Sequence, residues 1–159
     1  MGLFERLLRR RYDDPTLGTL VGAWGRWRGQ IGLGPGPAMP LVLTGDWAAP
    51  HTARLHLARE LPTRYPPLVP TIEEALFEHY EPYGEAIASG DEPPHPRVPV
   101  LTQPEQVRPY VIPVRVLIEA VGGVDTVEIA YRAAWDDEHT LGARIQGWRL
   151  VGLNGSVRV

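Results

Sequence analysis

The sequence predicts an α+β fold, a strongly twisted antiparallel sheet with two main helices packed on one face. Three observations carry this prediction. Residues 17–44 form short apolar runs separated by glycines, residues 50–88 place apolar side chains at helical spacing, and residues 110–153 alternate apolar and polar side chains. The first and third patterns are typical of antiparallel strands, and the second is typical of amphipathic helices.

Length and composition indicate one self-sufficient domain and exclude several kinds of chemistry. At 159 residues the chain is the size of one domain, and it can bury roughly 70% of the surface exposed on unfolding. Cys and Lys are absent, which excludes disulfides, thiolate nucleophiles, Schiff-base lysines and a Walker lysine. Serine occurs only at Ser89 and Ser156, neither in a G-x-S-x-G elbow, so an α/β-hydrolase is excluded too.

Charge and hydropathy restrict the partners. A net charge of −3 argues against nucleic-acid binding through the whole surface. No apolar run approaches the roughly 20 residues of a membrane span, and the N-terminus lacks the pattern of a signal peptide. We therefore expect a cytoplasmic protein without membrane contact. Its oligomeric state stays open, with a homodimer among the alternatives.

The N-terminal third predicts a short helix followed by strands. Residues 3–11 carry leucines at helical spacing and end in three arginines, which suit the C-terminal end of a helix dipole. Most such helices pack on the domain, and contact of the arginines with nucleic acid or a membrane surface is the alternative. Residues 17–44 then predict a β-meander, interrupted by the Gly-Pro loop at 34–37.

The helical segment over 50–88 is predicted to contain two helices. The first ends at Pro62, because proline breaks a helix interior, and the prolines up to Pro70 predict a loop. Thr71 and Glu74 have the spacing of a capping box, which would start the second helix. Its acidic residues predict a solvated face able to meet a basic partner. A Pro-rich loop should occupy 89–109.

The C-terminal antiparallel sheet over 110–153 has a testable register. A two-residue turn at Gly122-Gly123 places Ile118 opposite Val127 and continues to Tyr110 opposite Trp135, so that every apolar pair shares one face. The other face, which includes Glu128, should be solvated or covered by a partner.

The stretch Trp135–Gly142, WDDEHTLG, is the main candidate site. Strand alternation would place Asp136 and Glu138 on one face and Asp137 and His139 on the other, so the four side chains would not converge. A turn instead lets an aspartate bind the amides ahead of it. An Asp–His pair also orients a general base or a metal ligand. A structural turn, a partner-binding loop and chemistry all stay open.

Other candidate residues have a packing interpretation beside a functional one. His79 lies on the apolar face of the second helix, where a packed, hydrogen-bonded histidine is more common than a ligand. Trp24, Trp27 and Trp47 favour core or rim packing, with a stacking platform for bases or sugars as the alternative.

The WDDEHTLG stretch and the hairpin predicted after it resemble the end of a group of bacterial domains of unknown function, in which W-D-x-E-H-G-L-G precedes a short final hairpin. The order of elements over residues 14–153 is also similar. Thr140 departs from that pattern, which has Gly there. The resemblance implies no catalytic residues. Some members of the group resemble accessory or immunity proteins encoded beside toxins, which implies a role in binding.

We expect a protein-binding module rather than an enzyme, with no cofactor and no metal. The binding candidates are Glu73, Glu74, Glu78 and Asp137. The alternative is a metal-dependent or acid/base enzyme that uses Asp136, Glu138 and His139, with His79 as a further participant.

Overall fold

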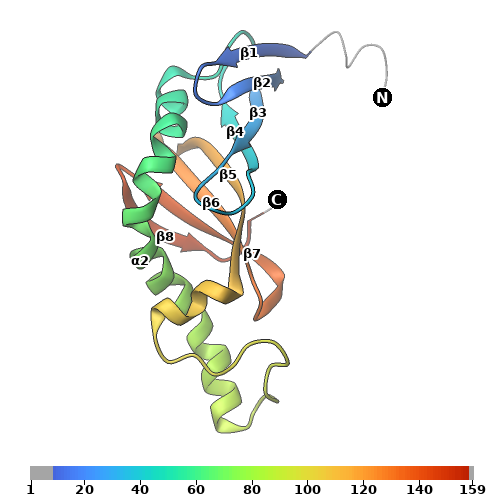
Figure 1. Cartoon of the computed structure of the whole chain (residues 1–159), viewed down its shortest axis with the longest axis vertical. Coiled ribbons are helices and arrows are strands. Elements are labelled where there is room, and N and C mark those ends of the chain that lie inside the picture. The colour runs from blue at the N-terminus through green and yellow to red at the C-terminus, as the bar shows by residue number, and fades with distance from the viewer. Residues whose placement is uncertain (1–8, 158–159) are drawn as a thin grey trace. The chain divides into compact units, whose positions relative to one another are not determined.

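The computed structural model describes residues 9–157 (Figure 1). In this part of the chain eight strands form one sheet, in the same order as in the sequence. The strands are β1 (Arg10–Asp14), β2 (Gly18–Ala23), β3 (Arg26–Ile31), β4 (Met39–Thr44), β5 (Val111–Val121), β6 (Val124–Ala133), β7 (Asp136–Gln146) and β8 (Arg149–Asn154). The same residues include the long helix α2 (Thr52–Ser89) and the 3₁₀ helix η1 (Pro104–Tyr110). The fold is α+β with a mostly antiparallel sheet.

One strand pair departs from the antiparallel prediction. β4 and β5 pair in parallel, with Leu41 opposite Val116 and Leu43 opposite Ile118. Parallel neighbours need a long crossover connection, because a tight turn reverses the chain direction. Here that connection contains α2 and η1. Alternation of side chains is the same in both kinds of pair, so the sequence pattern did not distinguish them.

The chain divides into two compact units. The first contains the chain up to Tyr65 together with Arg115–Glu128, and the second contains Pro66–Val114 and the chain from Ile129 onward. The helix α2 and the strands β5 and β6 contribute residues to both units. The single domain expected from the length stays a prediction.

In the first unit, the meander predicted over 17–44 corresponds to β2, β3 and β4, with β1 paired antiparallel to β2. Trp24 and Gly25 both have positive φ, 54° and 71°, as a two-residue type I′ turn requires. Trp27 is 1% exposed, and a Cβ added at Gly22 would come within 2.7 Å of its ring. Trp27 is therefore a core residue, whereas Trp24 and Trp47 are exposed.

Apolar packing and ion pairs hold the start of α2 against the strands of this unit. Leu55, Ala58 and Leu61 are buried on one side of the helix. Arg59 donates from Nε to the buried carboxylate of Asp14 at 3.0 Å.

The N-terminal helix predicted over 3–11 lies mostly outside the described residues. Its last two positions belong to β1, where Arg10 pairs with Gly22 and Arg11 with Val21. For these two residues the helix prediction was wrong, because pairing with β2 replaces local helical propensity.

The division of the helical segment into two helices was also wrong. α2 is one helix of 38 residues that runs through Pro62, Pro66, Pro67 and Pro70. All four prolines are exposed, so the carbonyl groups that lose a helical hydrogen bond can bind water instead. Thr71 and Glu74 lie inside this helix and form no capping box. Because buried residues continue at Leu68 and Ile72, packing compensates for the missing bonds.

In the second unit, the later part of α2 places Leu68, Ile72, Leu76 and Tyr80 in the core at four-residue intervals. Buried residues of β6 and β7 also belong to this core, namely Ile129, Tyr131, Ala133, Leu141, Ala143 and Ile145. The predicted Pro-rich loop over 89–109 ends earlier than expected, because η1 begins at Pro104, where a proline in the first helical position is favourable.

The two-residue turn predicted at Gly122-Gly123 is present between β5 and β6, with φ of 61° and 79°. The face predicted to be solvated is buried at Glu128, which is 8% exposed, and at Thr126 and Ala130. β6 lies between β5 and β7 in the sheet, and at these residues both of its faces are buried, although antiparallel sheets commonly leave one face in water. Ile112, predicted to be buried, is 63% exposed near the start of β5. Within residues 9–157, no helix has the length and apolar character needed to cross a membrane.

Candidate functional site

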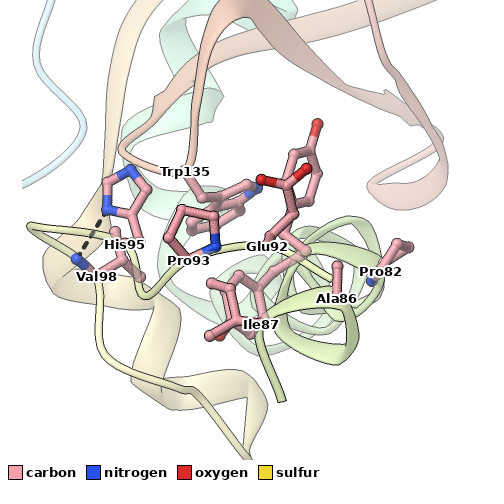
Figure 2. Close-up of a pocket in the computed structure, with 10 residues that line it drawn as sticks. Pro82, Ala86, Ile87, Glu92, Pro93, His95, Val98 and Trp135 are labelled. Carbon is pink, nitrogen blue, oxygen red and sulfur yellow. Dashed lines mark hydrogen bonds between the residues drawn. The ribbon is translucent and has the colours of Figure 1, made fainter. Parts of the chain in front are cut away.

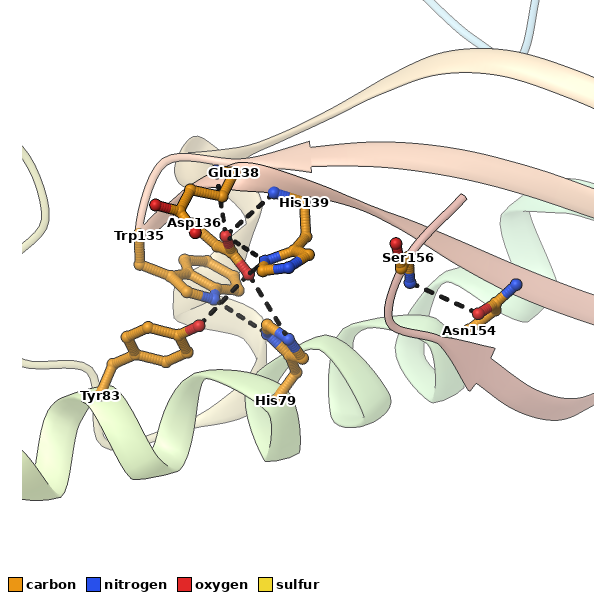
Figure 3. A network of polar contacts seen from close by, with 8 residues as sticks. All are labelled: His79, Tyr83, Trp135, Asp136, Glu138, His139, Asn154 and Ser156. Atoms are coloured by element: carbon orange, nitrogen blue, oxygen red, sulfur yellow. Dashed lines mark hydrogen bonds and ion pairs between the residues drawn. The ribbon is translucent and has the colours of Figure 1, made fainter. Parts of the chain in front are cut away.

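The carboxylate of Asp136 is the centre of the most connected polar site in the second unit (Figure 3). It is the first residue of β7 and is 7% exposed. Its Oδ1 accepts the backbone N–H groups of Glu138 at 3.2 Å and of His139 at 3.1 Å. Bonds of this kind are an ordinary use of aspartate where a strand begins, and they hold the first residues of β7 around the carboxylate.

The turn brings the ring of His139 onto the same carboxylate. Its Nδ1 lies 3.0 Å from Oδ1 and 3.1 Å from Oδ2 of Asp136. An ionised carboxylate only accepts hydrogen bonds, so Nδ1 is the donor and carries a proton. Nε2 is the ring nitrogen that Asp136 does not engage, and the side chain as a whole is 46% exposed. This is the arrangement of an oriented imidazole base.

His79, from α2, approaches Asp136 with its own ring. The indole Nε1 of Trp135 donates to Nδ1 of His79 at 3.2 Å, and an indole N–H can only donate. His79 therefore accepts at Nδ1, and its neutral form carries the proton on Nε2, which lies 3.8 Å from Oδ2 of Asp136. Burial lowers the pKa of His79; nearby Asp136 opposes this effect and His139 adds to it.

Electrostatics keep the carboxylate of Asp136 ionised. Burial opposes its charge, but the hydrogen bonds from the His139 ring and from two backbone amides outweigh that cost and lower its pKa. Tyr83 donates its hydroxyl to Oδ2 at 3.2 Å. Burial and the neighbouring Asp136 raise the pKa of Tyr83, so its hydroxyl stays a donor. We call these five residues, His79, Tyr83, Trp135, Asp136 and His139, the aspartate network.

The network joins residues that strand alternation had separated. Asp136 and His139 were expected on opposite faces, but the turn places them in contact. Glu138 contributes its amide, and its side chain is exposed. Asp137 points elsewhere and meets Arg97 at 3.3 Å in an exposed pair. Among residues 9–157, no group of three or more His, Asp or Glu is placed to hold a metal ion.

The parts that Tyr83 and Trp135 take in the network were not expected from the sequence. Tyr83 follows His79 by four residues, so the two share one side of α2, and their rings lie 5.8 Å apart. That spacing was the available signal. Trp135 had been assigned to the core, and it is 6% exposed. Its hydrogen bond to His79 joins positions 56 residues apart in the chain, which no local pattern indicates.

A second feature is an acidic face on the later part of α2. Glu74, Glu78, Glu81 and Glu85 are exposed and follow one another at intervals of four, three and four residues, which places them along one side of a helix. Glu73 does not belong to this face. It is 5% exposed and forms a two-point pair with Arg108 of η1 at 2.6 and 3.0 Å.

The acidic face borders an apolar groove of about 350 Å³. Phe77 and Ala88 form part of its α2 side, and Glu81 and Glu85 also line it. Val100 and Leu101 form part of the opposite side. Val100 is 55% exposed there. We call this hollow the Phe77 groove. The hydroxyl of Tyr80 accepts the amide of Leu101 at 3.0 Å and thereby fixes the far side.

A comparison with known families places these features in context. Residues 39–156, from β4 to just beyond β8, match a family described as a domain of unknown function, DUF6985. The chain belongs to this family. The match includes the aspartate network, the acidic face and the Phe77 groove, so all three lie in the family's part of the chain. A search of curated proteins and a search of solved structures each found no match.

Proposed function

We propose that the chain is a bacterial, cytoplasmic protein-binding module that holds a basic segment of another protein. The observation that carries the proposal is the acidic face of α2 beside the Phe77 groove. A carboxylate-lined hollow with an exposed apolar side chain offers both charge attraction and an apolar anchor point. Both are needed, because charge gives orientation and rate whereas buried apolar side chains give affinity.

The negative charge of the acidic face has no basic residue near it in the sequence. Residues 65–96 contain seven Asp or Glu and no Arg or Lys. Within the acidic face, Glu74 and Glu78, and likewise Glu81 and Glu85, stand four residues apart, where like charges destabilise a helix. A partner carrying Arg or Lys would relieve this repulsion. The fitting partner segment therefore has basic residues around one apolar side chain that enters the Phe77 groove.

The proposed kind of partner rests on the resemblance of the terminal motif. Some members of the group that this motif resembles are similar to accessory or immunity proteins encoded beside toxins. A toxin with a basic surface would be neutralised if this module covered it, and no catalytic group would be required. We therefore propose that this protein-binding module is an immunity-type inhibitor.

A capture experiment tests the binding role. The tagged full chain is incubated with lysate of its native host, beside the variant Glu81→Arg/Glu85→Arg and the matched control Glu105→Arg. Glu105 is exposed on η1 and outside the groove. The wild type and the control should retain the same protein, the double variant should lose it, and added salt should weaken its capture because the attraction is screened.

The captured protein is then purified and titrated calorimetrically against the three chains. A partner that binds the double variant as tightly as the wild type would refute this surface. Absence of any protein common to the wild type and the control would refute the binding role.

The aspartate network supports acid/base catalysis as a second candidate function. The specific observation is the half-exposed ring of His139, oriented through Nδ1 by a buried carboxylate, which is what a general base needs. Under this hypothesis His139→Ala abolishes an activity that Glu138→Gln preserves, in a screen of generic ester, phosphoester and glycoside substrates. If the wild type turns over none of these substrates, or if His139→Ala retains the activity, the catalytic hypothesis fails for them.

A further inference from the structure

A cavity of about 470 Å³, which shares Tyr80 with the Phe77 groove, lies within the second unit (Figure 2). Its volume falls in the range of small-molecule sites. It is lined by Tyr80, Pro82, Tyr83, Ala86, Ile87, Glu92, Pro93, His95, Val98 and Trp135. Most of these side chains are apolar or aromatic, and nothing in the aspartate network or the acidic face requires such a space.

The aromatic residues of the wall have their polar atoms engaged away from a ligand. The indole N–H of Trp135 is donated to His79, and the hydroxyl of Tyr83 is donated to Asp136. The hydroxyl of Tyr80 lies between Pro99 and Leu101, with which it forms hydrogen bonds of 3.4 and 3.0 Å. The rings of Tyr80 and Trp135 meet edge to face at 5.4 Å, which keeps them rigid. These aromatic residues therefore offer ring surface to a ligand, and they offer no free donor.

The histidine of the wall is also engaged. Nδ1 of His95 accepts the backbone N–H groups of Arg97 and Val98, both at 3.1 Å. Nδ1 is therefore engaged by these two amides and is not available to a ligand in the cavity.

The remaining charge is negative. Glu92 is the acidic residue among the lining side chains. It lies three residues beyond Ser89, the last residue of α2, and its amide donates to the carbonyl of Ala86 at 3.0 Å. A helix C-terminus carries a partial negative charge that basic residues usually offset. The last turn of α2 contains none. The carboxylate of Glu92 and the C-terminal end of α2 therefore both favour a cation in the cavity.

We infer that this cavity binds a small amphiphilic organic cation, with the ammonium group at Glu92 and the apolar body among Tyr80, Tyr83 and Trp135. Aromatic faces attract cations through their electron-rich surface, and the attraction increases when water is excluded. Neutral apolar molecules would lose the attraction of the carboxylate. Anions would be repelled by both the carboxylate and the helix end. The inference goes beyond the proposed protein binding and uses a different surface.

Calorimetric titration of the full chain with three probes of one shape tests this inference. The probes are phenylbutylammonium, phenylbutanol and phenylbutyrate, which differ in charge at one end. We expect the ammonium to bind about three- to tenfold more tightly than the alcohol, because a partly exposed charge pair contributes modestly, and the carboxylate to bind most weakly. The indole signal of Trp135 in an NMR spectrum should shift on binding, whereas those of the exposed Trp24 and Trp47 should stay in place.

Three variants locate the site. Glu92→Gln removes the charge and should make the affinities for the ammonium and the alcohol equal. Glu85→Gln is an equal charge change outside the cavity and should preserve the difference between the two affinities. Ala86→Leu fills the cavity at a helical position where leucine is well tolerated. It should weaken the binding of both probes by the same factor. Each variant is checked for an unchanged melting temperature. Equal affinity of ammonium and alcohol in the wild type, tighter binding of the carboxylate, or no ammonium binding at millimolar concentration would overturn the inference.

Discussion

At the scale of single residues, Asp136 has the largest structural consequence in the site. One carboxylate accepts two amides, a tyrosine hydroxyl and an imidazole. Asp136→Asn keeps the shape but removes the charge, and hydrogen bonds to charged groups contribute about 1.5–3 kcal/mol each. We expect a loss of about 1–3 kcal/mol in the free energy of unfolding, measured by urea denaturation. Asp137→Asn, on an exposed neighbour, should change it by less than about 0.5 kcal/mol. Equal effects of the two variants would contradict the network.

The protonation of His79 predicts a pH dependence of stability. Burial lowers its folded-state pKa, so the unfolded chain binds a proton first as the pH falls. The contribution of His79 to stability is therefore fully present above the unfolded-state pKa of about 6.5 and is lost as the pH falls from there through the lower folded-state pKa. Protonation at Nδ1 would also break the bond from Trp135.

His79→Asn isolates this contribution, because the asparagine oxygen can accept from Trp135 but does not titrate. When the pH falls from neutral to about one unit below the ordinary pKa of histidine, we expect the wild type to lose more stability than the variant. Denaturant midpoints at the two pH values measure the difference, and the other histidines are common to both chains. An identical pH response in the two chains would show that His79 is not held neutral.

Gly84 gives a third residue-scale prediction. A Cβ at this position would lie 2.9 Å from the buried ring of Tyr80. Alanine gains about 1 kcal/mol of helix propensity over glycine, but overpacking a rigid ring costs about 1–3 kcal/mol. We expect Gly84→Ala to lower the thermal midpoint slightly. A gain in stability, as propensity alone would give, would mean that Tyr80 can move aside.

At the scale of elements, the prolines of α2 are the main departure from sequence expectation. Pro70 is exposed inside the helix and has no amide hydrogen. Pro70→Ala restores a helical hydrogen bond, and although alanine makes the unfolded chain more flexible by up to about 1 kcal/mol, the removal of an interior proline gains about 3 kcal/mol. We expect a net stabilisation of about 1–2 kcal/mol by urea denaturation. Thr71→Ala serves as the control with a small effect. Lower stability of Pro70→Ala would argue that the helix is interrupted there.

At the scale of the whole molecule, charge is unevenly distributed. The first unit contains ten Arg and eight Asp or Glu, whereas the second contains six Arg and eleven Asp or Glu. An excess of one sign in one unit favours a partner of the opposite sign and increases its association rate. The acidic face would then be retained for binding although it costs helix stability.

This cost can be measured with Glu78→Arg. The change converts repulsion with Glu74 and Glu81 into attraction, and each such pair contributes about 0.2–0.5 kcal/mol. We expect the variant to be more stable by about 0.5–1 kcal/mol in denaturation while its capture of a basic partner weakens. If Glu78→Arg both destabilised the chain and bound the partner normally, the acidic face would have a structural role instead.

The sequence by itself determined the local elements and the excluded chemistries. The strands over 17–44, the helical content of 50–88 and the Gly122-Gly123 turn follow from patterns that adjacent residues carry. The same is true of the solvated carboxylates on the later part of α2, but not of Glu73, whose burial depends on the distant Arg108, nor of Glu128, which is buried in β6.

Only the tertiary structure decided the features that depend on residues far apart in the chain. Packing of Leu68 and Ile72 carries α2 through its prolines, although proline alone favours a break. The crossover pairs β4 with β5 in parallel, which alternation cannot reveal. The Asp136 turn gathers His79, Tyr83 and His139, because a hydrogen bond depends on distance in space and not on separation along the chain.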